Sequence, residues 1–127
     1  MKDPVKKMFE QGYLLLVESE GRYYTPLKLM LENMGLNWKE EKARIISNPL
    51  FAAGLKELNV YDGEESHKVL SMETPHLFAW LMRYNPDDYE GEVKSKLAVA
   101  QQSSLDALCM LCRKNADILQ PQFEMCQ

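Results

Sequence analysis

The chain has 127 residues, of which 46% are hydrophobic and 27% are charged, and its formal net charge is −4. This length suits one domain that buries a core without metal or disulfide support, and the composition excludes a disordered chain. The net negative charge argues against sequence-independent binding to nucleic acid, which needs a surplus of Lys and Arg. A protein partner, including a basic DNA-binding one, fits this balance better.

The cellular compartment follows from the start of the sequence and from its cysteines. The apolar run at residues 13–17 is too short for a secretory leader or a membrane span. The three cysteines form an odd set, which does not suggest a disulfide framework. We therefore expect a reducing, cytoplasmic environment and no membrane association.

A β-hairpin is predicted near the start of the chain. Residues 13–17 form a short apolar run, as in a buried strand, and residues 22–25 are expected to form its partner strand. Residues 19–21 end in a glycine and supply the turn between them. The two strands are therefore expected to pair antiparallel.

The first helix is predicted to begin at Thr25 and Pro26. The threonine hydroxyl is expected to cap the free amides, and proline suits the first helical position. Apolar residues then recur at helical spacing, at Leu27, Met30, Leu31 and Met34. Gly35 is expected to end this helix, since glycine adopts a left-handed backbone at little cost.

A second helix is predicted over residues 38–47. Asn37 and Glu40 form a capping box in front of it, and Asn48-Pro49 ends it because the residue before proline avoids helical geometry. We expect its buried side to include Trp38, Ile45 and the stem of Lys42. A short turn at residues 50–52 should follow.

The second half of the chain predicts another hairpin and two more helices. Strands at residues 55–61 and 67–72 flank a loop at residues 62–66. Thr74-Pro75 repeats the pattern of a capping threonine followed by proline and predicts another helix start, and residues 85–86 break that helix. Asp87 or Asp88 is then expected to cap a long final helix over residues 89–115.

The predicted fold is therefore α+β: two antiparallel β-hairpins form a small sheet packed with about four helices, the last of them long. We expect a single domain over residues 1–127. Its core should span about residues 13–112, followed by a loose tail from about residue 116.

No group of residues predicts catalysis or metal binding. Cys109 and Cys112 form a CxxC pair, but a metal site needs two more ligands at suitable spacing, so core packing or an interface explains them better. His67 and His76 lie near no recognisable nucleophile motif, which favours structural or surface roles. No glycine-rich phosphate loop is present. We therefore expect no enzyme activity, no cofactor and no metal.

The acidic residues around position 90 have a simple structural interpretation. They cluster at the predicted start of the last helix, where carboxylates complement the positive end of the helix dipole. The residues are Asp87, Asp88, Glu90 and Glu92. This interpretation is favoured over a metal or acid–base site.

The first two helices and Gly35 resemble a helix-turn-helix, which would direct Lys39, Lys42 and Arg44 toward DNA. Acidic neighbours at Glu40 and Glu41 cancel this positive charge. Glu41 and Arg44 also occupy positions that the motif buries. A face that is solvated or touches a protein is favoured over a DNA reader.

Residues 105–112 are almost continuously apolar. A helix that is apolar all round must be covered on more than one side, so a second subunit could supply part of the cover. A central core helix explains the pattern equally well. The residues expected to mediate self-association are Leu105, Leu108, Met110 and Leu111.

The order of these features resembles the N-terminal domain of phage antirepressor proteins. The matching segments are residues 24–27 (YTPL), 34–38 (MGLNW), 44–45 (RI), 77–81 (LFAWL) and the helix at 97–108. The resemblance covers about residues 13–112, and its specificity comes from the order and spacing of individually weak motifs. Gln101 keeps a position of the family's closing helix. The departures are Ala79 for glycine, Ala100 for tyrosine and Ser103 for glutamate, which we expect to alter the surface more than the core.

The resemblance implies a regulator that inactivates a phage or prophage repressor by direct protein–protein contact and so promotes lytic gene expression in a bacterial host cell. The residues expected to contact the repressor are Trp38, Lys39, Lys42 and Arg44. Homo-oligomerisation through the C-terminal helix would raise avidity. The alternatives are a DNA-binding transcriptional regulator of the Bro-N type and a phage inhibitor of a host defence protein.

Overall fold

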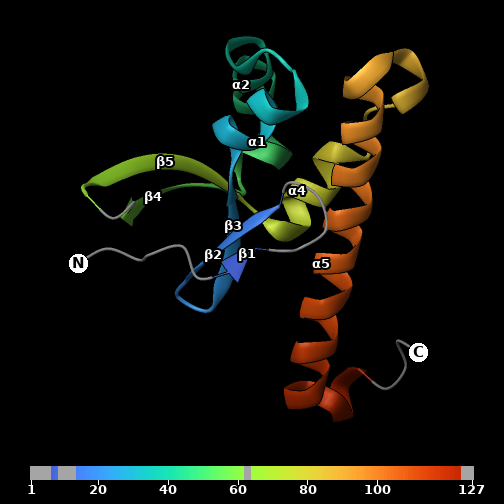
Figure 1. Ribbon diagram of the computed structural model, residues 1–127. Coiled ribbons are helices and arrows are strands. Elements are labelled where there is room, and N and C mark those ends of the chain that lie inside the picture. The colour runs from blue at the N-terminus through green and yellow to red at the C-terminus, as the bar shows by residue number, and fades with distance from the viewer. Residues whose placement is uncertain (1–6, 9–13, 62–63, 124–127) are drawn as a thin grey trace.

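The computed structural model describes residues 7–8, 14–61 and 64–123. An antiparallel sheet has the strand order β1-β2-β3-β5-β4 (Figure 1). Its strands are β1 (Lys7–Met8), β2 (Leu15–Ser19), β3 (Arg22–Pro26), β4 (Leu55–Tyr61) and β5 (Ser66–Glu73). The helices are α1 (Leu27–Met34), α2 (Trp38–Ser47), α3 (Pro49–Ala52), α4 (Thr74–Leu81), the 3-10 turn η1 (Pro86–Asp88) and α5 (Gly91–Phe123). The predicted α+β class is confirmed.

Both predicted hairpins are present, as β2–β3 and β4–β5, and β3 pairs with β5 to join them into one sheet. In the first hairpin Glu20 and Gly21 have φ angles of 54° and 82°, the left-handed pair that a two-residue hairpin turn requires. The short strand β1, which pairs with β2, was not predicted. Residue 13 of the first predicted strand and residues 62–63 of the second loop lie outside the described residues.

The predicted C-terminal end of α1 and the predicted start of α2 are confirmed. Gly35 ends α1 with a φ of 88°, and the amide of Leu36 donates to the carbonyl of Leu31 at 3.0 Å. The Asn37 side chain accepts from the amide of Glu40 at 3.0 Å and so caps α2. Residues 50–52, expected as a turn, belong instead to the single-turn helix α3, because Asn48 accepts from the next available amide and starts a new helix.

Two predicted threonine caps are wrong. Thr25 is the penultimate residue of β3, and its hydroxyl makes no capping bond to α1. Thr74 begins α4, but its hydroxyl donates to the carbonyl of Tyr23 at 3.1 Å and ties the helix to the sheet. In both cases the strand extends directly into the helix, so the position before the helix is Pro26 or Glu73.

The predicted start and end of the last helix are also wrong. Asp87 and Asp88 lie in η1, where Asn85 accepts from the amide of Asp87, and α5 begins only at Gly91. The helix then continues through residue 123, so the stretch from 116 that was expected to be a loose tail is helical. No helix among the described residues is long and apolar enough to cross a membrane.

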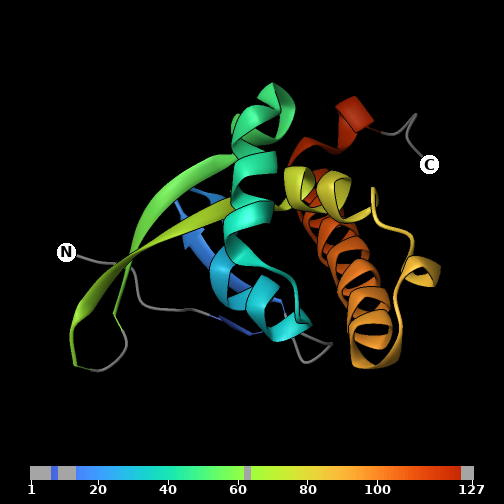
Figure 2. The ribbon, with the colours of Figure 1, turned by 90° about the horizontal axis from the view of Figure 1, so that it is seen from above.

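The main hydrophobic core lies between the sheet and the helices, which gather on one side of the sheet (Figure 2). Helix α4 contacts β3 and β5 on one side and α5 on the other, so it forms a middle layer. Trp80 and Leu81 of α4 are completely buried, as are Met72 of β5 and Leu97 of α5. Ala100 and Ser103 are buried too, so these departures from the family pattern affect the core, contrary to expectation.

Candidate functional site

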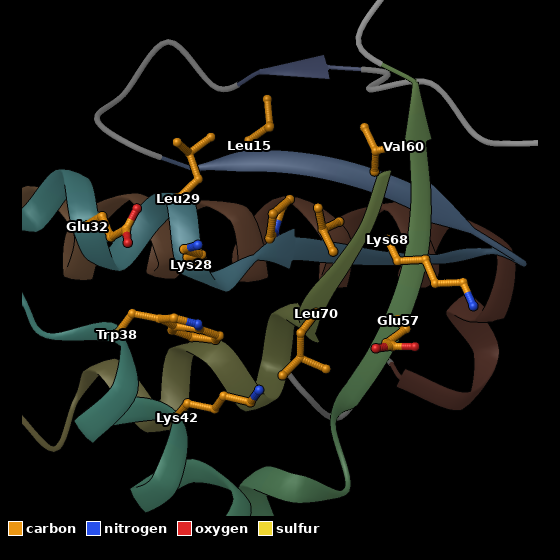
Figure 3. Close-up of a pocket in the computed structure, with 12 residues that line it drawn as sticks. Leu15, Lys28, Leu29, Glu32, Trp38, Lys42, Glu57, Val60, Lys68 and Leu70 are labelled. Atoms are coloured by element: carbon orange, nitrogen blue, oxygen red, sulfur yellow. The ribbon is translucent and has the colours of Figure 1, made fainter. Parts of the chain in front are cut away.

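A groove of about 640 Å³ lies between helices α1 and α2 and the β4–β5 hairpin (Figure 3). Its apolar lining consists of Leu15, Pro26, Leu29, Val60, Val69 and Leu70, together with the ring of Trp38. Its charged lining consists of Lys28, Glu32, Lys42, Glu57 and Lys68. The groove therefore combines an apolar surface with charges of both signs.

Helical spacing places the α1 and α2 side chains in the groove. The buried residues of α1 face the core, so Lys28 and Glu32, one turn apart, share the opposite face. In α2 the same spacing puts Lys42 one turn after Trp38. Each helix therefore presents one lysine to the groove.

Strand alternation supplies the third wall. Lys68 and Leu70 are two residues apart on β5 and point to the same side of the sheet. Glu57 of β4 lies directly opposite Leu70 in the hairpin. An acidic and a basic side chain thus flank an apolar one on this wall.

Trp38 is the largest side chain in the groove. It is half-buried and packs partly against the main core, while the Lys42 ammonium lies 5.9 Å from the centre of its ring. This distance is within the range of a cation–π interaction. The indole is therefore held in place by the fold and still presents a surface to the groove.

The groove charges are not neutralised by neighbouring side chains. Within residues 7–8, 14–61 and 64–123, no ion pair or side-chain hydrogen bond engages the lysines or glutamates of the groove. Elsewhere on the surface, several opposite charges do pair: Lys94 lies 3.3 Å from Asp87 and Lys96 lies 3.4 Å from Glu92. Among the described residues, the charged groups of the groove are therefore unpaired.

The four residues predicted to contact a partner do not share one face. Trp38 and Lys42 line the groove together. Lys39 is exposed outside it, and Arg44 points elsewhere, with a guanidinium nitrogen 2.7 Å from a carboxylate oxygen of Glu41. Lys42 as a whole residue is exposed, and Trp38 is only half-buried.

Sequence reasoning missed the other charged residues of the groove. Lys28 and Glu32 lie one turn apart beside Leu29, whose exposed fraction of 54% is high for a leucine. This spacing could have indicated a functional face on α1. Lys68 and Glu57 come together only through the strand register, which the sequence does not specify.

Glu41, whose charge was expected to offset those of its basic neighbours, is a buried carboxylate. Only 4% of the residue is exposed. The Tyr84 hydroxyl donates to one of its oxygens and Arg44 binds the other. Burial, and then the hydrogen bond to Glu41, raise the pKa of Tyr84 far above its ordinary value. The cluster fastens α2 to the segment after α4 and does not line the groove.

The apolar stretch of α5 is only partly buried among the described residues. Ala107 is completely buried, whereas the four residues predicted for self-association are half-buried: Leu105, Leu108, Met110 and Leu111. Cys109 and Cys112 are exposed free thiols, which excludes core packing as their role. The four residues lie on one helix segment, and each remains partly exposed in the part of the chain that the structure describes.

The histidines form no chemical site with their neighbours. His67 is exposed on β5. His76 packs closely against Gly54, and its Nδ1 lies 3.9 Å from a carboxylate oxygen of Glu73. Among the described residues, no group of three His, Cys, Asp or Glu side chains is arranged to hold a metal ion.

Gln101, the residue that keeps the family position in the closing helix, has a structural role. Its amide donates to the carbonyls of Leu81 and Tyr84 at 3.0 and 2.9 Å, at the C-terminal end of α4. The Leu81 carbonyl also accepts from the amide of Tyr84 at 3.1 Å, so the glutamine adds a second donor there and joins α5 to the C-terminal end of α4.

Comparison with known proteins gives one match. Residues 6–116 match the family described as the P22_AR N-terminal domain. No curated protein and no solved structure matches the sequence. The matched region includes all five segments that carried the resemblance, and it covers most of the chain. The chain therefore belongs to the P22_AR N-terminal domain family, the N-terminal domain of phage antirepressors.

Proposed function

We propose that this protein is a phage antirepressor-like regulator that binds a phage or prophage repressor and inactivates it by direct contact. The observation that carries the proposal is the family match over residues 6–116. Its action would promote lytic gene expression in the cytoplasm of the bacterial host. It works by binding, without making or breaking covalent bonds.

The groove supports this proposal as the contact surface. It joins a fixed aromatic side chain, Trp38, to apolar residues and to free charges from three separate walls. Interfaces between proteins are enriched in such partly exposed aromatic residues, which contribute much of the binding energy. A repressor held there would be inactivated by occlusion or distortion of its DNA-binding or dimerisation surface.

The proposal is tested with the repressor encoded nearest to this gene. The purified repressor is first bound to its operator DNA, and the protein is added in increasing amounts while release of the DNA is followed by gel shift. We expect release at a defined stoichiometry. Failure to bind the repressor, in solution or on DNA, contradicts the proposal.

The DNA-binding alternative predicts a different result in the same assay. A direct DNA reader would shift free DNA on its own, with affinity that falls steeply as salt rises. The structure gives this alternative little support, because Arg44, one of its three basic residues, is engaged by Glu41. If the repressor is not bound but a host defence protein is recovered from lysate, the second alternative takes its place.

Self-association through α5 is a separate part of the proposal. The half-buried apolar residues at 105–111 would be covered by the same residues of another copy. Light scattering on the purified protein gives the mass directly. Replacing Leu108 with glutamate should convert an oligomer to a monomer, whereas a wild-type protein that is strictly monomeric at high concentration contradicts this part.

A further inference from the structure

We infer that the groove between α1, α2 and the β4–β5 hairpin binds an acidic, amphipathic peptide segment of the partner protein. Trp38 is the apolar contact in this arrangement, and Lys28, Lys42 and Lys68 are the charge partners. The inference rests on the proposed function in one respect, namely that the partner is a protein. It adds the chemistry of the segment that the partner inserts.

The arrangement of the lysines is the first argument. Lys28 comes from α1, Lys42 from α2 and Lys68 from β5, so the three lysines line the groove from three different walls (Figure 3). No carboxylate of the described residues pairs with any of them. The groove thus has a local surplus of positive charge, three lysines against two glutamates, in a chain whose net charge is −4. This local reversal of sign favours an acidic ligand.

The apolar lining is the second argument. Leu70 on the hairpin and Leu29 on α1 line the groove together with the Trp38 ring, and about half of Leu29 is exposed to solvent. A volume of about 640 Å³ accommodates several side chains rather than a folded domain. The ligand must therefore be a short segment that carries apolar residues among its acidic ones.

The glutamates distinguish a peptide from a single-stranded nucleic acid. Aromatic and basic residues together also suit nucleic acids, whose bases stack while their phosphates pair with lysines. Glu32 and Glu57, however, lie in the same groove and would repel a backbone that carries a charge at every nucleotide. A peptide can place carboxylates near the lysines and neutral or basic groups near the glutamates.

The test uses three synthetic peptides of twelve residues with the same leucine pattern, in which the polar positions are all glutamate, all glutamine or all lysine. A twelve-nucleotide oligothymidylate is the fourth probe. Binding is followed by the fluorescence of Trp38 and its quenching by acrylamide, because the other tryptophan, Trp80, is completely buried. We expect the glutamate peptide to shield Trp38 and to bind at least tenfold more tightly than the other three probes.

Matched variants locate the binding site. Replacing Lys28, Lys42 or Lys68 with glutamine should each weaken binding of the glutamate peptide about two- to fivefold, the effect expected of exposed ion pairs. Lys39→Gln makes the same charge change on α2 outside the groove and should have no effect. Glu57→Gln should tighten binding. Circular dichroism of each variant verifies that the fold is intact.

Several results overturn the inference. They are equal binding of the lysine peptide, tighter binding of the oligothymidylate, an equal loss of affinity in Lys39→Gln, and no binding of any peptide at millimolar concentration. The repressor assay separates this inference from the proposed function. A triple variant replaces Lys28, Lys42 and Lys68 with glutamine together. If the repressor binds this variant as well as it binds the wild-type protein, the proposed function stands and the inferred peptide-binding role of the groove is refuted. If the glutamate peptide binds but the repressor does not, the peptide-binding inference stands and the proposed function is refuted.

Discussion

Replacing Tyr84 with phenylalanine removes the hydroxyl that donates to the buried carboxylate of Glu41. The ring of Tyr84 keeps its edge-on contact with Trp80, whose centre lies 5.1 Å away, so packing changes little. A hydrogen bond to a charged group contributes about 1.5–3 kcal/mol. Only 4% of Glu41 is exposed, so water has little access to replace the lost hydroxyl donor. We therefore expect the free energy of unfolding to fall by about 2 kcal/mol.

Urea denaturation followed by circular dichroism measures this change as a lower midpoint with an unchanged slope. Tyr89→Phe is the matched control, because Tyr89 packs beside Tyr84 with ring centres 6.3 Å apart and its hydroxyl makes no hydrogen bond to the described residues. Combining Tyr84→Phe with Glu41→Gln should give non-additive losses, with a coupling of about 1 kcal/mol. A loss below about 0.5 kcal/mol, or an equal loss in the control, would refute the assignment of this hydrogen bond to stability.

Three further predictions concern stability. Gln101→Ala should cost about 1–2 kcal/mol because the two hydrogen bonds from Gln101 to the carbonyls of Leu81 and Tyr84 are lost, whereas Gln102→Ala, at an exposed position, should cost less than about 0.5 kcal/mol in the same urea titration. Gly54→Ala should destabilise the protein by about 2 kcal/mol, since the new methyl group would lie 2.4 Å from the His76 ring, and His76→Ala in the same chain should restore most of the loss. The raised pKa of Tyr84 means that the folded state keeps its proton while the unfolded state releases it near pH 10, so stability should decline above pH 10 and decline less in Tyr84→Phe; equal curves would contradict this.

The sequence predicted most of the secondary structure because local signals decide it. Gly35 and Asn37 are capping residues whose preference is strong and short-range, and both end or start a helix as predicted. The helix caps predicted at Thr25 and Thr74 were wrong because both residues take part in tertiary packing. Thr25 is completely buried, and the Thr74 hydroxyl donates to a neighbouring strand. A capping preference gives no information about such distant partners.

The candidate groove was only half predictable for the same reason. Trp38 and Lys42 lie one turn apart, so a helical pattern could place them together. The opposite wall depends on the β4–β5 register, which sets Glu57 against Leu70. The position of Arg44 outside the groove depends on Glu41, which is buried and accepts from both Arg44 and Tyr84, the latter more than forty residues further along the chain. Pairings across such separations are not encoded in any local pattern.

Helix α2 lines the groove with one face and contacts the segment after α4 with another. One face holds Trp38 and Lys42 in the groove, and the other is anchored through Glu41 to the residues that follow α4. Any ligand that shifts this ten-residue helix must also move the carboxylate against its hydroxyl and guanidinium donors. The hydrogen bonds of Glu41 therefore hold α2, and with it one wall of the groove, against the segment that follows α4.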